Sequence, residues 1–176
     1  LMIDMTLKYI PMKTIKLICL LFPLFSGLTA YSQNTKEDQK SAQQANIKGL
    51  IEAKKFVFRA QSATSSRGAT QQLSYGYSLA VSPDEIVADL PYFGRAYTAT
   101  MNPSEGGIKF TSSEFDFGVK NRKKGGWDIT IIPKDVPNAP KLYLSVTTNG
   151  NTSLRVISTN RESISFSGLI EAKKQE

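Results

Sequence analysis

The sequence has no histidine and only one cysteine, Cys19. Histidine is the commonest general base and a usual ligand of catalytic zinc. Its absence excludes Ser-His-Asp and Cys-His nucleophile systems and the usual catalytic zinc sites. Cys19 lies in an N-terminal segment that we predict to be removed on export. The mature chain would then have no thiolate chemistry and could form no disulfide, although its compartment would allow one.

Nucleotide-binding and metal-binding motifs are also missing. The glycine pairs Gly106-Gly107 and Gly125-Gly126 lie where hairpin turns are expected, not between a strand and a helix, so neither forms a phosphate loop or dinucleotide fingerprint. The acidic groups Asp84-Glu85 and Glu114-Asp116 lack the ligand density of a calcium loop. We therefore predict no cofactor and no metal site.

The N-terminal segment has the features of a secretory signal peptide. Met12 to Lys16 forms a short basic start, and Leu17 to Phe25 is an apolar run too short for a comfortable membrane span. Small residues at Ala30 and Ser32 fit a signal-peptidase site before Gln33. We predict a signal peptide over residues 1–32, of which residues 1–11 can be upstream sequence because Met12 is the more natural start.

The predicted signal determines the expected compartment and charge. After cleavage near Ser32/Gln33 the protein should be periplasmic or secreted, with no stable membrane insertion, and the early position of Cys19 argues against a lipid anchor. Removal of residues 1–32 takes three lysines and one aspartate, so the net charge changes from +7 to (22 − 3) − (15 − 1) = +5. This modest charge permits weak attraction to anionic polymers, but we expect no nucleic-acid partner for an exported protein.

Hydrophobic periodicity divides the mature chain into two parts. Residues 33–54 should form a polar lead and then an amphipathic helix from about Lys40 to Lys54, because Ala42, Ala45 and Leu50 can share one face. Residues 55–172 should form a single β domain, since apolar and polar residues alternate there with turn signals at regular spacing. The clearest alternation runs from Leu73 to Val81.

No stretch between the expected strands is long enough for a crossover helix, which excludes parallel pairing. The fold class that we predict is mainly β: an antiparallel meander of about eight strands, curled into a barrel or sandwich, with one N-terminal α-helix. The buried face changes parity between Phe110 and Phe115, which indicates a bulge or break near Ser112-Ser113. One further strand is expected over Tyr97 to Met101.

The most distinctive stretch is Leu90-Pro91-Tyr92-Phe93-Gly94-Arg95-Ala96-Tyr97. Pro91 has no N–H for a ladder, and Gly94 can adopt a positive φ, so the chain should bend here with two aromatic residues inside the bend. Tyr92, Arg95 and Tyr97 could stack on a flat ligand such as a sugar ring. Alternatively, an aromatic side chain of the bend closes one end of the core, and Arg95 pairs with a carboxylate.

Two other regions are weaker candidates for binding. Trp127 could be a stacking platform or a core anchor. The basic turn Arg122-Lys123-Lys124 beside it could hold an anionic glycan, or could simply be solvated and prevent edge pairing. Arg161 could bind a ligand or stabilise the turn that contains it. We therefore take Tyr92, Arg95, Tyr97 and Trp127 as candidate ligand-binding residues.

Five motifs of the sequence, taken in chain order, resemble those of a family of exported Bacteroidetes proteins known as domain of unknown function 4251 (DUF4251). They are Leu90 to Tyr97, Gly106 to Phe110, Gly126 to Ile129, Asn160-Arg161 and Ser165 to Gly168. The similarity runs from about Phe56 to Ile170. The resemblance implies an exported, mostly β domain, and brings no assigned activity or catalytic residue.

A short internal repeat has two interpretations. Gly-Leu-Ile-Glu-Ala-Lys-Lys occurs at Gly49–Lys55 and again at Gly168–Lys174. No wider similarity surrounds the copies, so the match is either coincidence or the remnant of an internal duplication.

Three functions remain open. The first is a non-enzymatic exported domain that binds a small molecule, a glycan or another envelope protein, because the chain combines many aromatic residues with no catalytic set. The second is a carbohydrate hydrolase that uses two carboxylates across a cleft. The third is a structural or assembly role, which exposed strand edges or an apolar patch would indicate.

Overall fold

The computed structural model describes residues 30–74, 76–95, 97 and 106–173. Residues 1–29, which make up most of the predicted signal, lie outside this range, as does most of the strand expected from Tyr97 to Met101. Helix α2 (Ala30–Glu52) begins ten residues before the expected Lys40. The chain separates into two units between Ser41 and Ala42, and the strands that the structure describes all belong to the second unit.

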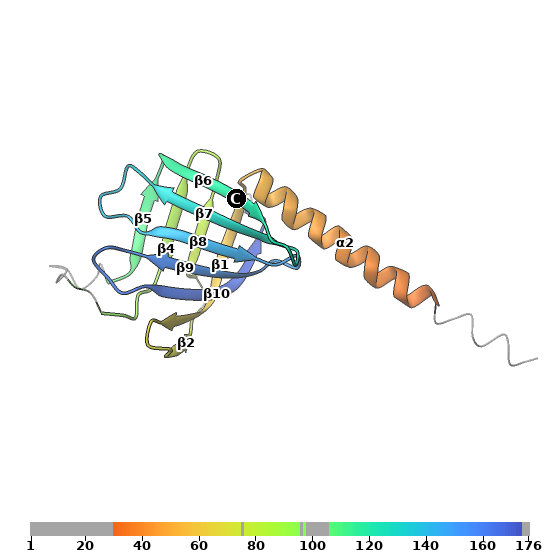
Figure 1. Cartoon of the computed structure of the whole chain (residues 1–176), viewed down its shortest axis with the longest axis horizontal. Helices are drawn as coiled ribbons and strands as arrows, with labels where there is room; N and C mark the ends of the chain where they lie inside the picture. Colours follow the sequence, from red (N-terminus) through yellow and green to blue (C-terminus); the bar gives the residue numbers. More distant parts are fainter. Residues whose placement is uncertain (1–29, 75, 96, 98–105, 174–176) are drawn as a thin grey trace, which may run out of the picture. The chain divides into compact units, whose positions relative to one another are not determined.

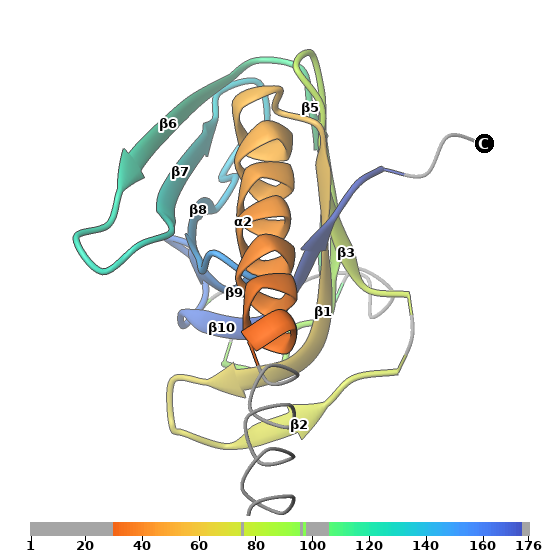
Figure 2. The same cartoon turned by 90° about the vertical axis from the view of Figure 1, so that its right-hand side faces the viewer.

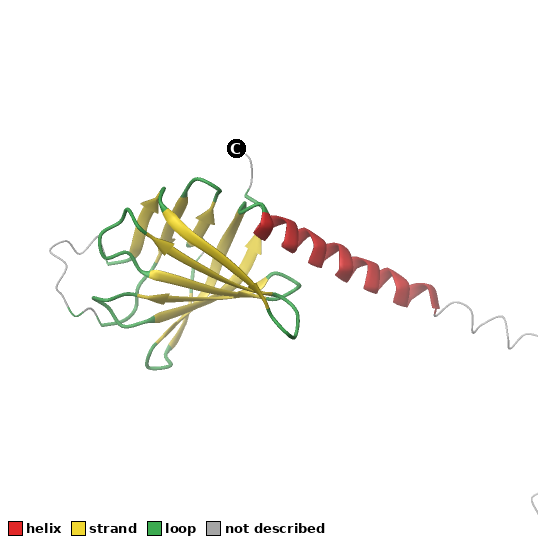
Figure 3. Ribbon diagram, turned by 45° about the horizontal axis from the view of Figure 1, so that its top comes forward, coloured by secondary structure: helices red, strands yellow, loops and turns green. Residues whose placement is uncertain are grey.

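The described part of this unit contains ten antiparallel strands (Figure 1). They are β1 (Phe56–Ser65), β2 (Thr70–Gln72), β3 (Ser78–Val81), β4 (Ile86–Leu90), β5 (Ile108–Ser112), β6 (Phe115–Asn121), β7 (Trp127–Pro133), β8 (Lys141–Val146), β9 (Asn151–Ile157) and β10 (Ile164–Glu171). The path across the sheet is β5-β4-β3-β1-β10-β9-β8-β7-β6, and β2 pairs only with β1. The sheet curls into a nearly closed barrel, so the predicted mainly β, antiparallel fold class is confirmed (Figure 3).

The first and last strands of the barrel pair in the middle of the path. β1 and β10 are antiparallel, with Val57 opposite Glu171 and Ser65 opposite Ile164. Figure 2 shows β6 to β9 on one side of the barrel and β1, β3 and β5 on the other, with β10 passing between the two sides. Pairing of β1 with β10 therefore joins the two halves of the chain into one wall.

The barrel is split between β5 and β6. β5 pairs with β4, β6 pairs with β7, and only Ser113 and Glu114 separate the two strands along the chain. Nine antiparallel strands form the path, so β5 and β6 at its two ends run in the same direction. They therefore form one strand that bends and passes from one edge of the sheet to the other. The break expected near Ser112-Ser113 is confirmed.

Asp135 holds this break in place. Its carboxylate accepts hydrogen bonds from the Ser112 hydroxyl at 2.5 Å and from the backbone N–H groups of Ser113 at 2.7 Å and Glu114 at 3.2 Å. These donors favour the charged form, so the pKa of Asp135 lies well below its ordinary value, with the Ser112 hydroxyl as the largest cause. These hydrogen bonds therefore hold the chain between β5 and β6 in a defined turn.

Side chains from all round the barrel fill its interior. The largest fully buried ones are Phe56, Phe58, Phe166, Ile51, Leu79, Ile86, Leu90, Ile129, Ile131, Leu142, Leu144 and Leu154. Ile47 and Ile51 of α2 belong to this cluster, and the Gln43 amide donates to the Asn149 carbonyl at 3.0 Å. The last turns of α2 therefore cover the end of the barrel that carries the β8–β9 turn.

A bulge lets β1 keep its buried face. The register shifts between Ala60, opposite Gly168, and Ser62, opposite Ser167, so Gln61 is the extra residue and Ala63 faces inward after it. The two strands approach closely there. A Cβ on Gly168 would lie 1.9 Å from the Arg59 carbonyl oxygen, so only glycine fits this position.

One expectation about the strands needs correction, and one of the two interpretations of the repeat gains support. The strand expected from Leu73 to Val81 is wrong in length, because a turn at Gly76 interrupts it and only Ser78–Val81 pairs as β3. The repeated heptapeptide has two different structures, since Gly49–Glu52 ends helix α2 and Gly168–Glu171 ends strand β10. This difference favours coincidence over duplication.

Candidate functional site

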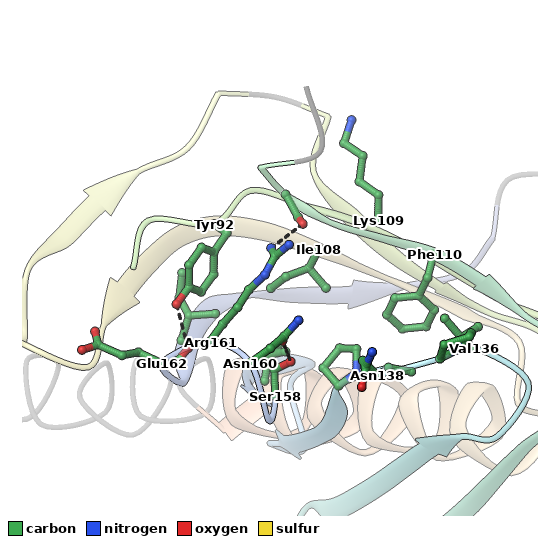
Figure 4. A pocket seen from close by; sticks show the side chains of 16 residues that line it. Tyr92, Ile108, Lys109, Phe110, Val136, Asn138, Ser158, Asn160, Arg161 and Glu162 are labelled. Atoms are coloured by element: carbon green, nitrogen blue, oxygen red, sulfur yellow. Dashed lines mark hydrogen bonds between the residues drawn. The ribbon is translucent and has the colours of Figure 1, made fainter. Parts of the chain in front are cut away.

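A cavity of about 230 Å³ lies at the barrel end opposite the last turns of α2 (Figure 4). One wall is the edge strand β5 with the residue before it, and the facing wall is the β7–β8 loop, Val136–Pro140. The floor and rim come from the end of β9, the β9–β10 turn and the start of β10. Among the described strands β5 pairs only with β4, so this wall of the cavity is an edge of the sheet.

The cavity has apolar walls and polar groups on its rim. Ile108, Pro140, Val156 and Ile164 are buried apolar residues that line it, with the half-buried Phe110 and Val136. The polar lining residues are Tyr92, Lys109, Asn138, Ser158, Asn160, Arg161 and Glu162. In Figure 4, Tyr92 and Arg161 lie at one end of the cavity, and Phe110 and Val136 lie at the other.

Tyr92 ties the Leu90–Tyr97 stretch to the β9–β10 turn. Its hydroxyl lies 2.8 Å from the Arg95 carbonyl oxygen and 3.0 Å from the Glu162 carbonyl oxygen, so it donates its proton to one or the other. The backbone adds two bonds, from Tyr97 N–H to the Asn160 carbonyl at 2.9 Å and from Glu162 N–H to the Arg95 carbonyl at 3.1 Å. Burial raises the pKa of Tyr92, and the negative charge of Glu162 raises it further.

Gly94 is needed for space and not for a positive φ. It is absent from the described glycines with positive φ, so that expectation is wrong. A Cβ at Gly94 would instead lie 2.5 Å from the Tyr92 hydroxyl oxygen. The bend therefore folds the Tyr92 side chain back over Gly94, which also brings the hydroxyl to the Arg95 carbonyl.

Arg161 joins three segments around the cavity. Its Nη1 donates to the Gly107 carbonyl at 2.8 Å, and its Cζ lies 5.2 Å from the centroid of the Tyr92 ring. The contact with Gly107 fixes the chain just before β5, and the contact with the ring is a cation–π interaction. Arg161 thus does more than stabilise its own turn, because it links the β9–β10 turn both to the Leu90–Tyr97 stretch and to the edge strand β5.

A second, more open hollow of about 290 Å³ lies on the other side of the bend. Ser65, Arg67, Phe93, Gly94, Arg95 and Glu162 line it. The Ser66 hydroxyl donates to a Glu162 carboxylate oxygen at 2.9 Å, which ties the tip of the β1–β2 hairpin to the β9–β10 turn. Phe93 is 41% exposed. Glu162 lines both hollows, so they are adjacent.

The candidate residues from the sequence are divided among different places. Tyr92 lines the cavity, Arg95 lines the second hollow, and Tyr97 is 68% exposed. Trp127 is only 7% exposed and belongs to the core cluster. It lies at the start of β7, whereas the β7–β8 loop that lines the cavity follows the end of that strand. Six residue steps of strand separate Trp127 from Pro133, about 20 Å, so the structure does not bring Trp127 to Tyr92.

Sequence reasoning missed the cavity residues on β5 and on the β7–β8 loop. The pattern from Val136 to Pro140 indicates only a loop, and nothing in it assigns a role to Ser158. One signal was present: Asn138 adopts φ 56°, a left-handed conformation that asparagine tolerates better than most residues. That signal marks a turn and does not reveal that the turn closes a cavity.

Two classes of site receive no support. Within residues 30–74, 76–95, 97 and 106–173, no three acidic, histidine or cysteine side chains group as a metal site. In the part of the chain that the structure describes, no helix is long and apolar enough to cross a membrane.

Fold and site together define an antiparallel β-barrel with a small cavity at one end. Residues 38–170 match the family model described as Domain of unknown function (DUF4251), and the chain belongs to this family. A crystal structure of a DUF4251 family protein from Bacteroides eggerthii has a similar fold, with 14% sequence identity and a TM-score of 0.56 over 74% of this chain and 88% of that chain. No curated protein matches the chain.

Proposed function

We propose that the protein is an exported, non-enzymatic binding domain that holds a small ligand, or one unit of a glycan, in the cavity at the end of its barrel. The observation that carries the proposal is the cavity itself. Its walls are assembled from segments far apart in the sequence, and they combine apolar surfaces with a few polar groups. This combination is typical of small-molecule sites in the mouths of β-barrels.

The dimensions of the cavity limit the ligand. Its volume of about 230 Å³ is below the range of about 300–1,000 Å³ that is common for drug-sized ligands. A ligand of roughly eight water volumes would fill it. A single sugar ring suits both this size and the lining, because the ring has apolar faces and polar edges that match Phe110 and Tyr92 on one hand and Asn138 and Asn160 on the other.

The lining favours binding over hydrolysis. A glycosidase needs two carboxyl groups that face each other across the scissile bond. Among the described residues that line the cavity, Glu162 is the only carboxylate, and one oxygen of its side chain already accepts a hydrogen bond from Ser66. We therefore place the carbohydrate hydrolase second. The periplasmic or secreted location rests on the signal peptide predicted over residues 1–32.

Native mass spectrometry tests the proposal on protein exported with its own signal and purified without detergent. We expect extra mass that is lost on denaturation, and a denatured mass that starts at Gln33. Val136→Trp should fill the cavity and remove the extra mass, since Val136 lines it from a loop. Val87→Trp is the matched control because Val87 is exposed on β4 outside the cavity. A bare native mass, together with no stabilisation by any of a panel of sugars, would contradict the proposal.

A further inference from the structure

The second hollow differs from the cavity in charge. Arg67 and Arg95 both line it, from the β1–β2 hairpin tip and from the bend, and both are exposed. Within the described residues neither guanidinium has an ion pair or a side-chain hydrogen bond. Glu162 is the only described carboxylate in the lining, which leaves a net charge of +1 (two arginines minus one glutamate) in a small area.

The remaining lining suits a planar, partly apolar ligand. Phe93 presents an exposed ring in the same hollow as the two guanidinium groups. Aromatic rings stack on the apolar faces of flat ligands. Guanidinium groups present a planar fork of donors that matches a carboxylate. A ring that carries a carboxylate would therefore use both features at once.

The two hollows are placed to hold neighbouring parts of one ligand. Glu162 lines both, and the bend contributes Tyr92 to the cavity and Phe93, Gly94 and Arg95 to the second hollow. The bend is fixed against the β9–β10 turn by the Tyr92 hydroxyl and by two backbone hydrogen bonds. The relative position of the two hollows is therefore built into the fold.

We infer that the ligand is an acidic oligosaccharide, with one sugar unit in the cavity and the carboxylate of the adjacent uronic acid unit held by Arg67 and Arg95. This inference rests on the proposed function and names the ligand class for it. Phe93 stacks on the acidic sugar, and Glu162, oriented by Ser66, accepts hydrogen bonds from sugar hydroxyls at the junction of the two units. Because the arginines are exposed, binding weakens as salt concentration rises.

Calorimetric titration with uronic acid trimers tests the inference. The panel contains galacturonic, glucuronic and mannuronic acid trimers, each beside its methyl ester, which keeps the rings and removes the charge. For at least one pair the acid should bind roughly tenfold more tightly than the ester, as expected for charge-assisted hydrogen bonds that are partly exposed to solvent. Equal affinity for acid and ester in every pair, or no binding of any trimer, overturns the inference.

Variants locate the charge contacts. Arg67→Gln with Arg95→Gln should lower acid affinity roughly tenfold, to the level of the ester, and leave ester affinity unchanged. The control is Lys55→Gln with Lys120→Gln, which removes the same charge from two exposed residues that line neither hollow. Glu162→Gln keeps an acceptor oxygen for the sugar hydroxyls and removes the negative charge, so it should strengthen acid binding. Equal losses in the arginine and lysine double variants would reject the site.

The proposed function and this inference fail in different ways. Val136→Trp should abolish binding of both acid and ester, because it fills the cavity and leaves the arginines in place. One outcome is that Val136→Trp releases the ligand seen by native mass spectrometry while acid and ester trimers bind equally to the wild-type protein. In that case the cavity binds a ligand, and the hollow lined by Arg67 and Arg95 does not bind a carboxylate. If Val136→Trp changes neither the native mass nor trimer binding, the proposed function itself is wrong.

Discussion

The Arg161 guanidinium carbon lies 5.2 Å from the centroid of the Tyr92 ring. This contact joins the bend after β4 to the turn between β9 and β10. The same guanidinium donates to the Gly107 carbonyl, so both segments are tied to the start of β5 as well. Two motifs that lie far apart in the sequence are thus parts of one structure, the rim of the cavity.

A double-mutant cycle should measure this contact. We expect Tyr92→Leu and Arg161→Gln each to destabilise the fold, and the double variant to lose about 0.5–1 kcal/mol less than the sum, as for a partly exposed cation–π pair. Urea unfolding of the four proteins gives the coupling energy. The control cycle pairs Tyr143→Leu with Arg161→Gln, because Tyr143 lies in the middle of β8 on the exposed face. Strict additivity in the first cycle would mean that the contact contributes nothing.

The Tyr92 hydroxyl makes a separate contribution. Tyr92→Phe keeps the ring over which Arg161 lies and removes the donor to the Arg95 or Glu162 carbonyl. We expect a loss of about 1 kcal/mol in the free energy of unfolding. Tyr143→Phe is the matched control, since the Tyr143 side chain is exposed, and it should change stability by less than about 0.5 kcal/mol. An unchanged Tyr92→Phe protein would show that water satisfies both carbonyls equally well.

Strand periodicity predicted most of the barrel. Ile86, Ala88 and Leu90 of β4 and the alternating residues of β8 and β9 are buried on one face as expected, because successive strand residues point to opposite faces. The prediction of one continuous strand from Leu73 to Val81 was wrong, although it rested on the same alternation as the correct predictions. Alternation reports only which residues can share a face, and it continues through the turn at Gly76 unchanged.

The cavity could not be predicted in this way. Its lining combines Tyr92, β5, the loop from Val136 to Pro140 and the turn at Arg161, which meet only after the sheet curls. The Leu90–Tyr97 stretch was recognisable because proline, glycine and aromatic residues coincide there. Its pairing with the Asn160–Glu162 turn was not, because the hydrogen bonds between them use main-chain groups that every residue carries, and the contact of Arg161 with the Tyr92 ring leaves no pattern in the sequence.

Gly168 should be among the least replaceable residues of the barrel. In Gly168→Ala the new Cβ would overlap the Arg59 carbonyl oxygen, so β1 and β10 must separate at the bulge. We expect a destabilisation of about 2–3 kcal/mol, as for other overpacked sites. Gly118→Ala on β6 is the control, because a Cβ at Gly118 would have nothing within 4 Å, and it should be within about 0.5 kcal/mol of wild type. Thermal unfolding of both variants measures the difference, and similar stabilities would show that the bulge adapts at little cost.

Asp135 should make the β5–β6 break sensitive to acid. Its pKa in the folded protein is below the ordinary value of 3.8, so the unfolded chain binds a proton more readily than the folded one. The stabilisation is therefore complete above the ordinary pKa and is lost as the pH falls through the folded pKa. Asp135→Asn keeps the shape and cannot be charged, so the stability gap between wild type and variant should be constant above about pH 5 and should narrow as the pH falls from there to about pH 2.5.

Urea unfolding across this range measures the gap, and NMR titration of the carboxyl carbon reports the pKa directly. Asp84→Asn is the control because it removes the same charge from an exposed residue, in the turn between β3 and β4, that takes no part in the hydrogen bonds to Asp135. The Ser112 hydroxyl is the largest cause of the low pKa, so Ser112→Ala should raise the pKa of Asp135 towards its ordinary value. An Asp135 carboxyl that titrates at its ordinary value in the wild-type protein would mean that the break is not held by these hydrogen bonds.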